Sequence, residues 1–153
     1  MFGSEYSKLL PNRKLTRNEE QDFIQRRTAD GYLELIEIKK PLSGQKLFNF
    51  DDSHDSYYPS APLSKVLGQV QNYLDLIDAD RYSIEHRDSE DPFKMRAKII
   101  IGRSEDGDQL KALRSLNGHL MRIEVITFDQ LIHIARNTLS YLYGSIRPAR
   151  QAV

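Results

Sequence analysis

Hydrophobic and polar residues repeat along the first third of the chain with the two-residue period of β-strands. A β-prone run at 22–27 and another at 32–40 flank Asp30-Gly31, and Asp-Gly between two such runs is typical of a hairpin with a two-residue turn. A weaker pattern within 4–15 predicts a short strand ahead of them. The first third is therefore expected to form antiparallel strands.

The rest of the chain alternates helical and strand patterns. In order, it predicts a helix from 64 to about 77, a strand at 97–102, a helix ending at 117–118, a strand at 123–126 and a helix at 129–143. Ser64 is the expected N-cap of the first helix. The strand at 97–102 should lie centrally, because its apolar run is short and β-branched, with the strand at 123–126 parallel to it. The last helix should turn one apolar stripe inward, made of Leu131, Ile132, Ala135, Leu139 and Leu142.

Residues 42–62 show no periodicity and are expected to form a long loop, of the kind that is often functional. The loop contains Phe48, Phe50, Tyr57 and Tyr58. These aromatic rings either stack on splayed bases or pack the loop onto the domain, and packing is the outcome we expect.

Composition narrows the class of protein. The 153 residues suit a single domain spanning 1–153, with a basic tail at 144–153. No stretch approaches the roughly 20 apolar residues of a membrane helix, so a cytoplasmic location is expected. The absence of cysteine excludes disulfides, thiolate zinc sites and cysteine nucleophiles. Because 22 basic and 22 acidic residues cancel, binding to a polyanion would require the basic groups to gather on one face.

One group of charged residues suggests chemistry. Side chains two apart on a strand share a face, so Glu37 and Lys39 are neighbours, and the two-residue turn would put Asp22 opposite Lys39 with Glu37 on the diagonal. Two carboxylates held this close need a cation, and hard oxygen ligands suit Mg²⁺ or Mn²⁺. The lysine could then act on a water and on a phosphate. A solvated strand face with an ordinary Asp-Lys pair would present the same residues.

Several segments, in order, resemble the nuclease domain of the Shedu family of bacterial anti-phage defence proteins. They are Asp22-Phe23-Ile24, Leu35-Ile36-Glu37-Ile38-Lys39-Lys40-Pro41, Leu67-Gly68-Gln69-Val70-Gln71-Asn72-Tyr73 and Ile99-Ile100-Ile101-Gly102-Arg103. Asp22 followed by Glu37-x-Lys39 also resembles the core of the PD-(D/E)xK nuclease superfamily. The resemblance implies a three-layer α/β, restriction-endonuclease-like fold with a mixed central β-sheet flanked by helices. It further implies a metal-dependent DNA endonuclease in which Asp22 and Glu37 hold Mg²⁺ or Mn²⁺ and Lys39 serves the water.

Gln69-x-x-x-Tyr73 resembles a helix motif found beside the active site in some of these nucleases, which adds Gln69 to the candidate catalytic residues. The alternative is that Tyr73 is simply core. Two features depart from the superfamily. Gln21 stands where a proline usually precedes the metal-binding Asp, and almost nothing precedes Phe2, where the family places a helix. The chain is therefore either a truncated domain or completed by another subunit, and we expect a homo-oligomer, because uncovered apolar sheet is normally buried by a partner.

The expected function is thus hydrolysis of DNA phosphodiester bonds, with DNA as the partner. A second hypothesis is a catalytically silent module of the same fold that binds nucleic acid or assembles with partners. A third, a small-ligand α/β domain, is disfavoured by the missing glycine fingerprint.

Overall fold

The computed structural model describes residues 6–11, 23–40, 42, 44–104 and 106–145. Its largest sheet contains β1 (Tyr6–Pro11), β2 (Phe23–Arg27), β3 (Leu33–Ile38), β6 (Arg96–Ile100) and β7 (Ile123–Ile126). The helices are α1 (Ala61–Ala79), α2 (Arg81–Asp88), α3 (Gly107–His119) and α4 (Phe128–Ser145). A second, two-stranded sheet contains β4 (Phe48–Asp51) and β5 (Ser56–Pro59).

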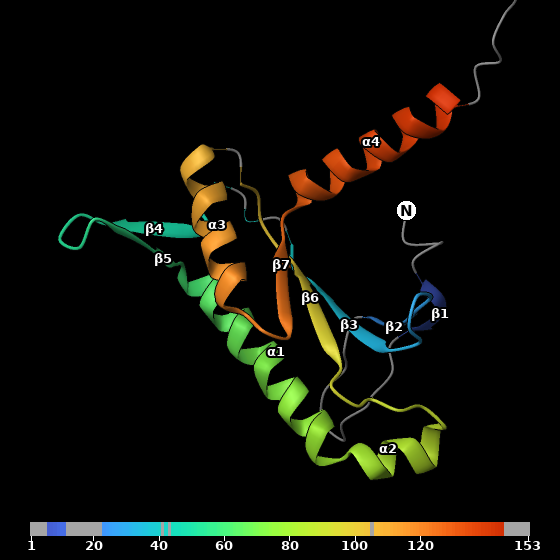
Figure 1. Cartoon of the computed structure of the whole chain (residues 1–153). Helices are drawn as coiled ribbons and strands as arrows, with labels where there is room; N and C mark the ends of the chain where they lie inside the picture. The colour runs from blue at the N-terminus through green and yellow to red at the C-terminus, as the bar shows by residue number, and fades with distance from the viewer. Residues whose placement is uncertain (1–5, 12–22, 41, 43, 105, 146–153) are drawn as a thin grey trace, which may run out of the picture.

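The five-stranded sheet is mixed, as predicted, with the order β1-β2-β3-β6-β7 (Figure 1). β1, β2 and β3 are antiparallel neighbours, whereas β3, β6 and β7 run parallel. β6 lies between β3 and β7, so the predicted central strand and parallel pair are confirmed. β3 is buried on both faces, and two glutamates, Glu34 and Glu37, are buried with it.

The β2–β3 hairpin confirms the predicted pairing but not the predicted turn. The amide of Arg27 donates to the carbonyl of Tyr32 (2.9 Å) and that of Gly31 to the carbonyl of Arg27 (3.0 Å), which closes a loop over 28–31. Gly31 has a φ of 72°, which only glycine adopts without strain. The register therefore differs by two residues from the one expected for an Asp-Gly turn, and at the far end of the hairpin Phe23 pairs with Ile36. Because the strand period is also two, every side chain keeps its predicted face.

One face of the sheet packs against α1 and α3, which form the main core with it (Figure 1). α1 contributes the apolar stripe that the sequence predicts: Leu63, Val66, Val70, Tyr73, Leu74 and Ile77. The helix begins one turn earlier than expected, with Ser60 rather than Ser64 at its N-cap. The amide of Ser64 already donates to the carbonyl of Ser60 (2.9 Å), so Ser64 lies inside the first turn.

α3 fastens the two sheets through two side-chain amides. Gln109 accepts from the amide of Phe48 and donates to its carbonyl, both at 2.9 Å. Asn117 makes the same pair of bonds to Val125, at 2.9 Å and 2.8 Å. Each side-chain amide thus makes the two hydrogen bonds that a neighbouring strand would make. These bonds satisfy backbone groups at the edges of β4 and β7.

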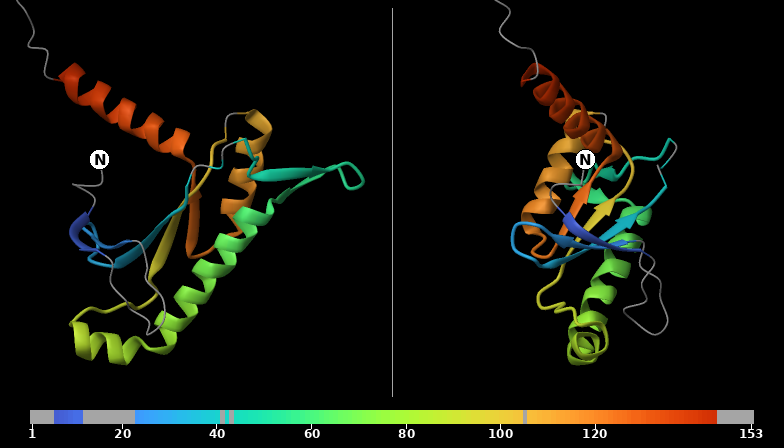
Figure 2. Two further views of the ribbon diagram at one scale, coloured as in Figure 1. Left: turned by 180° about the vertical axis from the view of Figure 1, so that it is seen from behind. Right: turned by 90° about the vertical axis from the view of Figure 1, so that its right-hand side faces the viewer.

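The segment expected as a long loop contains two strands. The residues expected as a long loop form the β4–β5 hairpin, which projects from the body beyond α1 and α3 (Figures 1 and 2). Of its aromatic rings only Phe48 is buried, so the expectation that they pack onto the domain is wrong for Phe50 and Tyr58. Tyr57 is partly exposed but lies against α3, where it hydrogen-bonds Asp108. α2 follows α1 after Asp80 and buries Ile84.

α4 makes the third layer on the other face of the sheet, which confirms the three-layer α/β fold (Figure 2). Phe128 and Leu131 pack against Ile36 and Ile100, and the helix then leaves the sheet. The prediction that the whole stripe turns inward is therefore wrong beyond the first turns. Three of its members are about half exposed: Ile132, Leu139 and Leu142. No helix in the described part of the chain has the length and apolar character needed to cross a membrane.

Candidate active site

The carboxyl end of β3 brings Glu37 and Lys39 together, as the strand period predicts. Lys39 Nζ lies 2.5 Å from Glu37 Oε1. The Glu37 side chain is only 4% exposed, whereas that of Lys39 is 34% exposed and reaches solvent. This end of the strand therefore presents an ion pair with one buried and one accessible partner.

Burial of Glu37 follows from its place in the sheet. It lies on the face that α1 and α3 cover, and Ile99 of β6 is its partner in the register. Moving a carboxylate into such a site is costly unless a cation and hydrogen bonds compensate, and Lys39 supplies part of that compensation. A buried acid beside a lysine is a candidate for function, because the fold accepts a cost in stability to hold it there.

The neighbouring backbone closes around this end of the sheet. The amide of Lys39 donates to the carbonyl of Ile100 (2.9 Å), which continues the β3–β6 ladder past the end of β3. Gly102 follows with a φ of 58°, and a Cβ there would lie 2.8 Å from Cδ2 of Leu47. The positive φ and this close approach both favour glycine, and Leu47 packs against this turn beside the candidate site.

Three basic residues are next in sequence to residues at this end. Lys40 follows Lys39, Arg103 follows Gly102 and Lys46 precedes Leu47, and all three are exposed. Two further basic residues lie elsewhere: Arg26 pairs with Glu90 and Arg27 with Asp30, at the opposite end of the hairpin. The structure thus separates these basic residues into two groups.

A metal ion would need more ligands than Glu37 supplies. Asp22, the other predicted ligand, lies outside the described residues. Among the residues that are described, no group of three or more His, Cys, Asp or Glu side chains comes together as a metal site. The carboxylate oxygens of Glu37 are of the type that Mg²⁺ and Mn²⁺ prefer, so the donor chemistry fits these ions, and the ligand set depends on Asp22.

Gln69 lies on α1, where its Nε2 donates to the hydroxyl of Tyr73. Tyr73 is 3% exposed and belongs to the main core, which confirms the core interpretation of that residue. The i, i+4 spacing that resembles a nuclease motif therefore forms a real side-chain contact. Gln69 is half buried, so its amide is not enclosed by the core.

Sequence reasoning missed a second buried ion pair on β3. Glu34, whose side chain is 5% exposed, lies 3.3 Å through Oε2 from Nζ of Lys98 on β6, whose side chain is 15% exposed. This pair lies on the face opposite Glu37, since the two glutamates are three residues apart on the strand. A glutamate at a central position of an apolar strand is the signal that could have found it.

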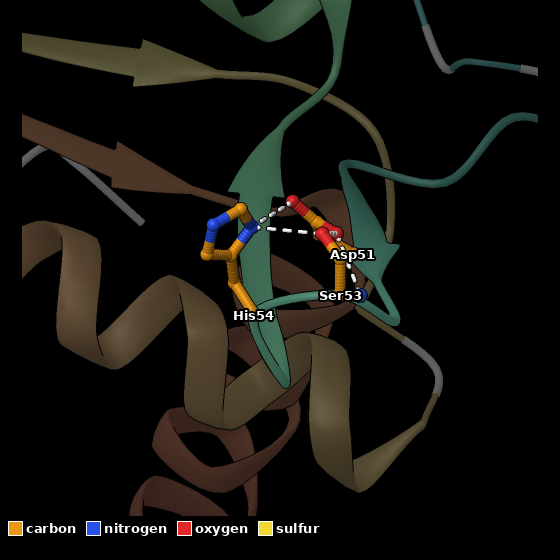
Figure 3. A network of polar contacts seen from close by, with 3 residues as sticks. All are labelled: Asp51, Ser53 and His54. Atoms are coloured by element: carbon orange, nitrogen blue, oxygen red, sulfur yellow. Dashed lines mark hydrogen bonds and ion pairs between the residues drawn. The ribbon is translucent and has the colours of Figure 1, made fainter.

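The tip of the β4–β5 hairpin contains a Ser, a His and an Asp in contact (Figure 3). His54 Nδ1 lies 2.9 Å from both Ser53 Oγ and Asp51 Oδ2, and Ser53 Oγ donates to Asp51 Oδ1 at 2.5 Å. In a hydrolase triad the serine and the aspartate use different ring nitrogens. Here both reach Nδ1, so the group fastens a turn and cannot relay a proton.

The hydrogen bond from the Ser53 side chain, followed by that from His54, lowers the pKa of Asp51 below its ordinary value. The carboxylate is thus held ionised at the tip. All four histidines are exposed.

A family model described as Shedu protein SduA, C-terminal, matches residues 4–132 of the chain. Because the match covers more than half of the chain, the chain belongs to this family, and that membership implies a role in anti-phage defence. No curated protein matches the chain.

Proposed function

With membership of the Shedu family as the premise, we propose that the chain is a metal-dependent DNA endonuclease that hydrolyses phosphodiester bonds in anti-phage defence. The observation that carries the proposal is the buried Glu37 carboxylate held against the accessible ammonium of Lys39 at the end of the central strand. The proposed substrate would place the protein in the cytoplasm, where phage DNA is found.

Asp22 and Glu37 are the proposed ligands of Mg²⁺ or Mn²⁺. Asp22 directly precedes Phe23, and Phe23 pairs with Ile36, which directly precedes Glu37. When bound, such an ion neutralises phosphate charge and makes a bound water more acidic. The metal requires an ionised Glu37, and the nearby Lys39 ammonium favours that form.

Lys39 is the proposed group that acts on water and phosphate. Its ammonium contacts the buried carboxylate of Glu37, and its side chain is partly exposed. The same ammonium can therefore hold a water and stabilise the negative charge that develops on the phosphate. Gln69 is proposed as a positioning residue. Its amide, oriented by Tyr73, would hold a neighbouring group of the site from α1.

The exposed cations Lys40, Lys46 and Arg103 are the proposed contacts to the DNA backbone. Because the chain has no net charge, this local group would provide the attraction. Replacing one of them should weaken binding uniformly across sequences and lower the salt dependence by about one ion.

Cleavage assays test the proposal. Purified protein is incubated with linear and supercoiled DNA, with and without Mg²⁺ or Mn²⁺. We expect cleavage that needs the ion and falls by about 10² to 10⁴ in Lys39→Ala, the range typical of a lost acid or base group. Lys111→Ala is the matched control, because the Lys111 side chain is 81% exposed and its salt bridge is to Asp108 on the surface of α3. Wild-type nicking by Lys39→Ala would contradict the assignment.

A catalytically silent DNA-binding or assembly module is the second candidate. The observation that favours it is that Glu37 is already ion-paired, in the same way as Glu34 on the other face. Binding of DNA with no cleavage under any of these ions would support the module and exclude the enzyme.

A further inference from the structure

α4 carries an apolar surface that the body of the chain leaves open. Phe128 and Leu131, in its first turn, pack against the sheet, and the helix then extends away from the body (Figures 1 and 2). Past that turn, Ile132, Leu139 and Leu142 are 47%, 52% and 50% exposed. None of these residues belongs to the proposed nuclease site.

The apolar residues of α4 have the spacing of a helix in a coiled coil. Steps of four, three, four and three residues separate Phe128, Ile132, Ala135, Leu139 and Leu142. This alternation repeats every seven residues and places all five side chains along one side of the helix, where a second helix can pack. We call these five residues the seam.

Few charges on α4 oppose the approach of an identical helix. From Gln130 to Ser145 the helix contains no acidic residue, and Arg136 is its only lysine or arginine. Arg136 lies beside the seam, and its long side chain can turn the guanidinium into solvent. Asp129, in the first turn, accepts from the amide and the hydroxyl of Ser104, both at 3.1 Å. Two copies of this surface can therefore meet without strong like-charge repulsion.

The apolar area on this side of α4 is of the size that a stable dimer needs. Ile132, Leu139 and Leu142 are about half exposed, and Tyr143, next to the seam, is 70% exposed. Together they leave roughly 450 Å² open, more than half of the roughly 800 Å² that each partner buries in a standard complex. Ile38, which is 40% exposed on the sheet face that α4 covers, adds to this area. A patch of this size is often an interaction site.

The seam is complementary to itself when the second helix runs antiparallel. With Ile132 opposite Leu142 of the second copy, Ala135 falls opposite Leu139 of the second copy. The smallest residue of the seam thus faces a large one, as close packing requires. A parallel second helix would instead place alanine opposite alanine and leave a gap. Antiparallel helices also bring the opposite ends of their dipoles together.

We propose that α4 pairs with α4 of a second copy of the chain, antiparallel and along the seam, to form a dimer with two-fold symmetry. The end of each helix then lies beside the sheet of the other copy, where it covers the exposed Ile38. The seam beyond Ile132 lies outside the residues that the family model matches. The pairing does not depend on the proposed nuclease function.

Molecular mass tests the pairing independently of cleavage. Light scattering during gel filtration should show the wild type as a dimer. Leu139→Glu puts a carboxylate into the seam twice in each dimer, so the dissociation constant should rise at least about tenfold. Asn137→Glu, on the opposite and exposed side of the helix, is the matched control and should leave the mass unchanged. Circular dichroism checks that both variants keep the fold.

Cross-linking tests the antiparallel register. The chain contains no cysteine, so engineered cysteines report the pairing without background. Ala135→Cys and Leu139→Cys are purified separately and then mixed under mild oxidation. The proposed register brings these two positions opposite each other, at a distance that a disulfide can span. The mixture should therefore form a cross-linked dimer faster than either variant alone, and Asn137→Cys should form none.

Three results would overturn the proposal. They are a monomeric wild type at about 100 µM, a dimer whose dissociation constant Leu139→Glu leaves unchanged, and cysteine variants that cross-link no faster when mixed than when separate. The first would leave the seam to a different partner, and the second would place the interface elsewhere on the molecule. The third would exclude the antiparallel register.

Discussion

The two faces of β3 each hold a buried glutamate beside a lysine, and the pairs differ in where the lysine lies. Glu34 pairs with Lys98 from the neighbouring strand, and both side chains are at most 15% exposed. Glu37 pairs with Lys39 from its own strand end, and that lysine is 34% exposed. The first pair is enclosed within the sheet, and the second opens to solvent.

The difference separates a structural ion pair from a candidate catalytic one. A cation enclosed with its partner can only compensate a buried charge, and such pairs add little net stability compared with apolar residues. A cation that reaches solvent can also meet a substrate. Two glutamates three positions apart on one strand, each beside a lysine, therefore support two different roles.

The largest expected effect is on stability at the enclosed pair. Lys98→Ala would remove the lysine that faces a buried Glu34, and losing one member of such a pair costs about 3 kcal/mol or more. Lys39→Ala should cost less than this, because Lys39 is 34% exposed and water can take its place beside Glu37. Urea unfolding of both variants measures the difference. Equal losses would show that the two pairs have the same role.

Replacing both residues of an ion pair tests the difference between the structural pair and the candidate catalytic pair more directly. Glu34→Leu with Lys98→Met should recover stability to within about 1.5 kcal/mol of the wild type, because apolar residues of similar volume often replace buried ion pairs without loss. It should also retain cleavage. Glu37→Leu with Lys39→Met should fold and cut no DNA. The comparison fails if the first double variant loses cleavage as completely as the second.

A third carboxylate, Asp129, is stabilised by hydrogen bonds and not by a lysine. Its replacement has the smallest expected effect on stability. Burial opposes its ionisation, but hydrogen bonds from Thr127 and Ser104 outweigh burial and lower its pKa below the ordinary 3.8. The ionised form thus stabilises the fold above pH 3.8, and this contribution is lost as the pH falls through the lower folded pKa.

Asp129→Asn should therefore cost about 1 kcal/mol near pH 7 and progressively less below pH 4. Denaturation at a series of pH values measures the difference between variant and wild type. A cost that stays constant down to pH 2 would mean that charge has no part in it.

The sequence predicted the strands and helices whose patterns are periodic, and the faces of Glu37 and Lys39 on β3. It did not predict the β4–β5 hairpin, because the turn at Asp51 to Asp55 is closed by side-chain bonds that leave no hydrophobic period. It also did not predict the length of the β2–β3 loop. The positive φ of Gly31 suits both the expected two-residue turn and the observed loop over 28–31, so the glycine does not distinguish them.

The sequence also did not predict how deeply some side chains are buried. The apolar stripe of α4 is real in the sequence, yet Leu139 and Leu142 are about half exposed because the helix leaves the sheet after its first turns. The pair of Glu34 and Lys98 joins strands that are 64 residues apart in the chain, and no local spacing indicates it. Periodicity identifies a face, and only the fold shows what covers that face.

Metal-dependent melting tests the central claim, that Glu37 and Lys39 form the centre of a metal-dependent nuclease, and it needs no DNA. Wild type, Glu37→Gln and Glu34→Gln are each melted with and without saturating Mn²⁺. An ion at a hundredfold excess over its Kd adds about 2.7 kcal/mol to the folded state, which at about 2 to 4 °C per kcal/mol raises the melting temperature by several degrees.

The account predicts that rise in the wild type and in Glu34→Gln, and its loss in Glu37→Gln. Without metal, Glu37→Gln should melt no lower than the wild type, because it would relieve the repulsion expected between the two proposed ligands. A Glu37→Gln variant that melts clearly lower, with Mn²⁺ stabilising all three proteins equally, would make Glu37 a structural partner of Lys39 and contradict the account.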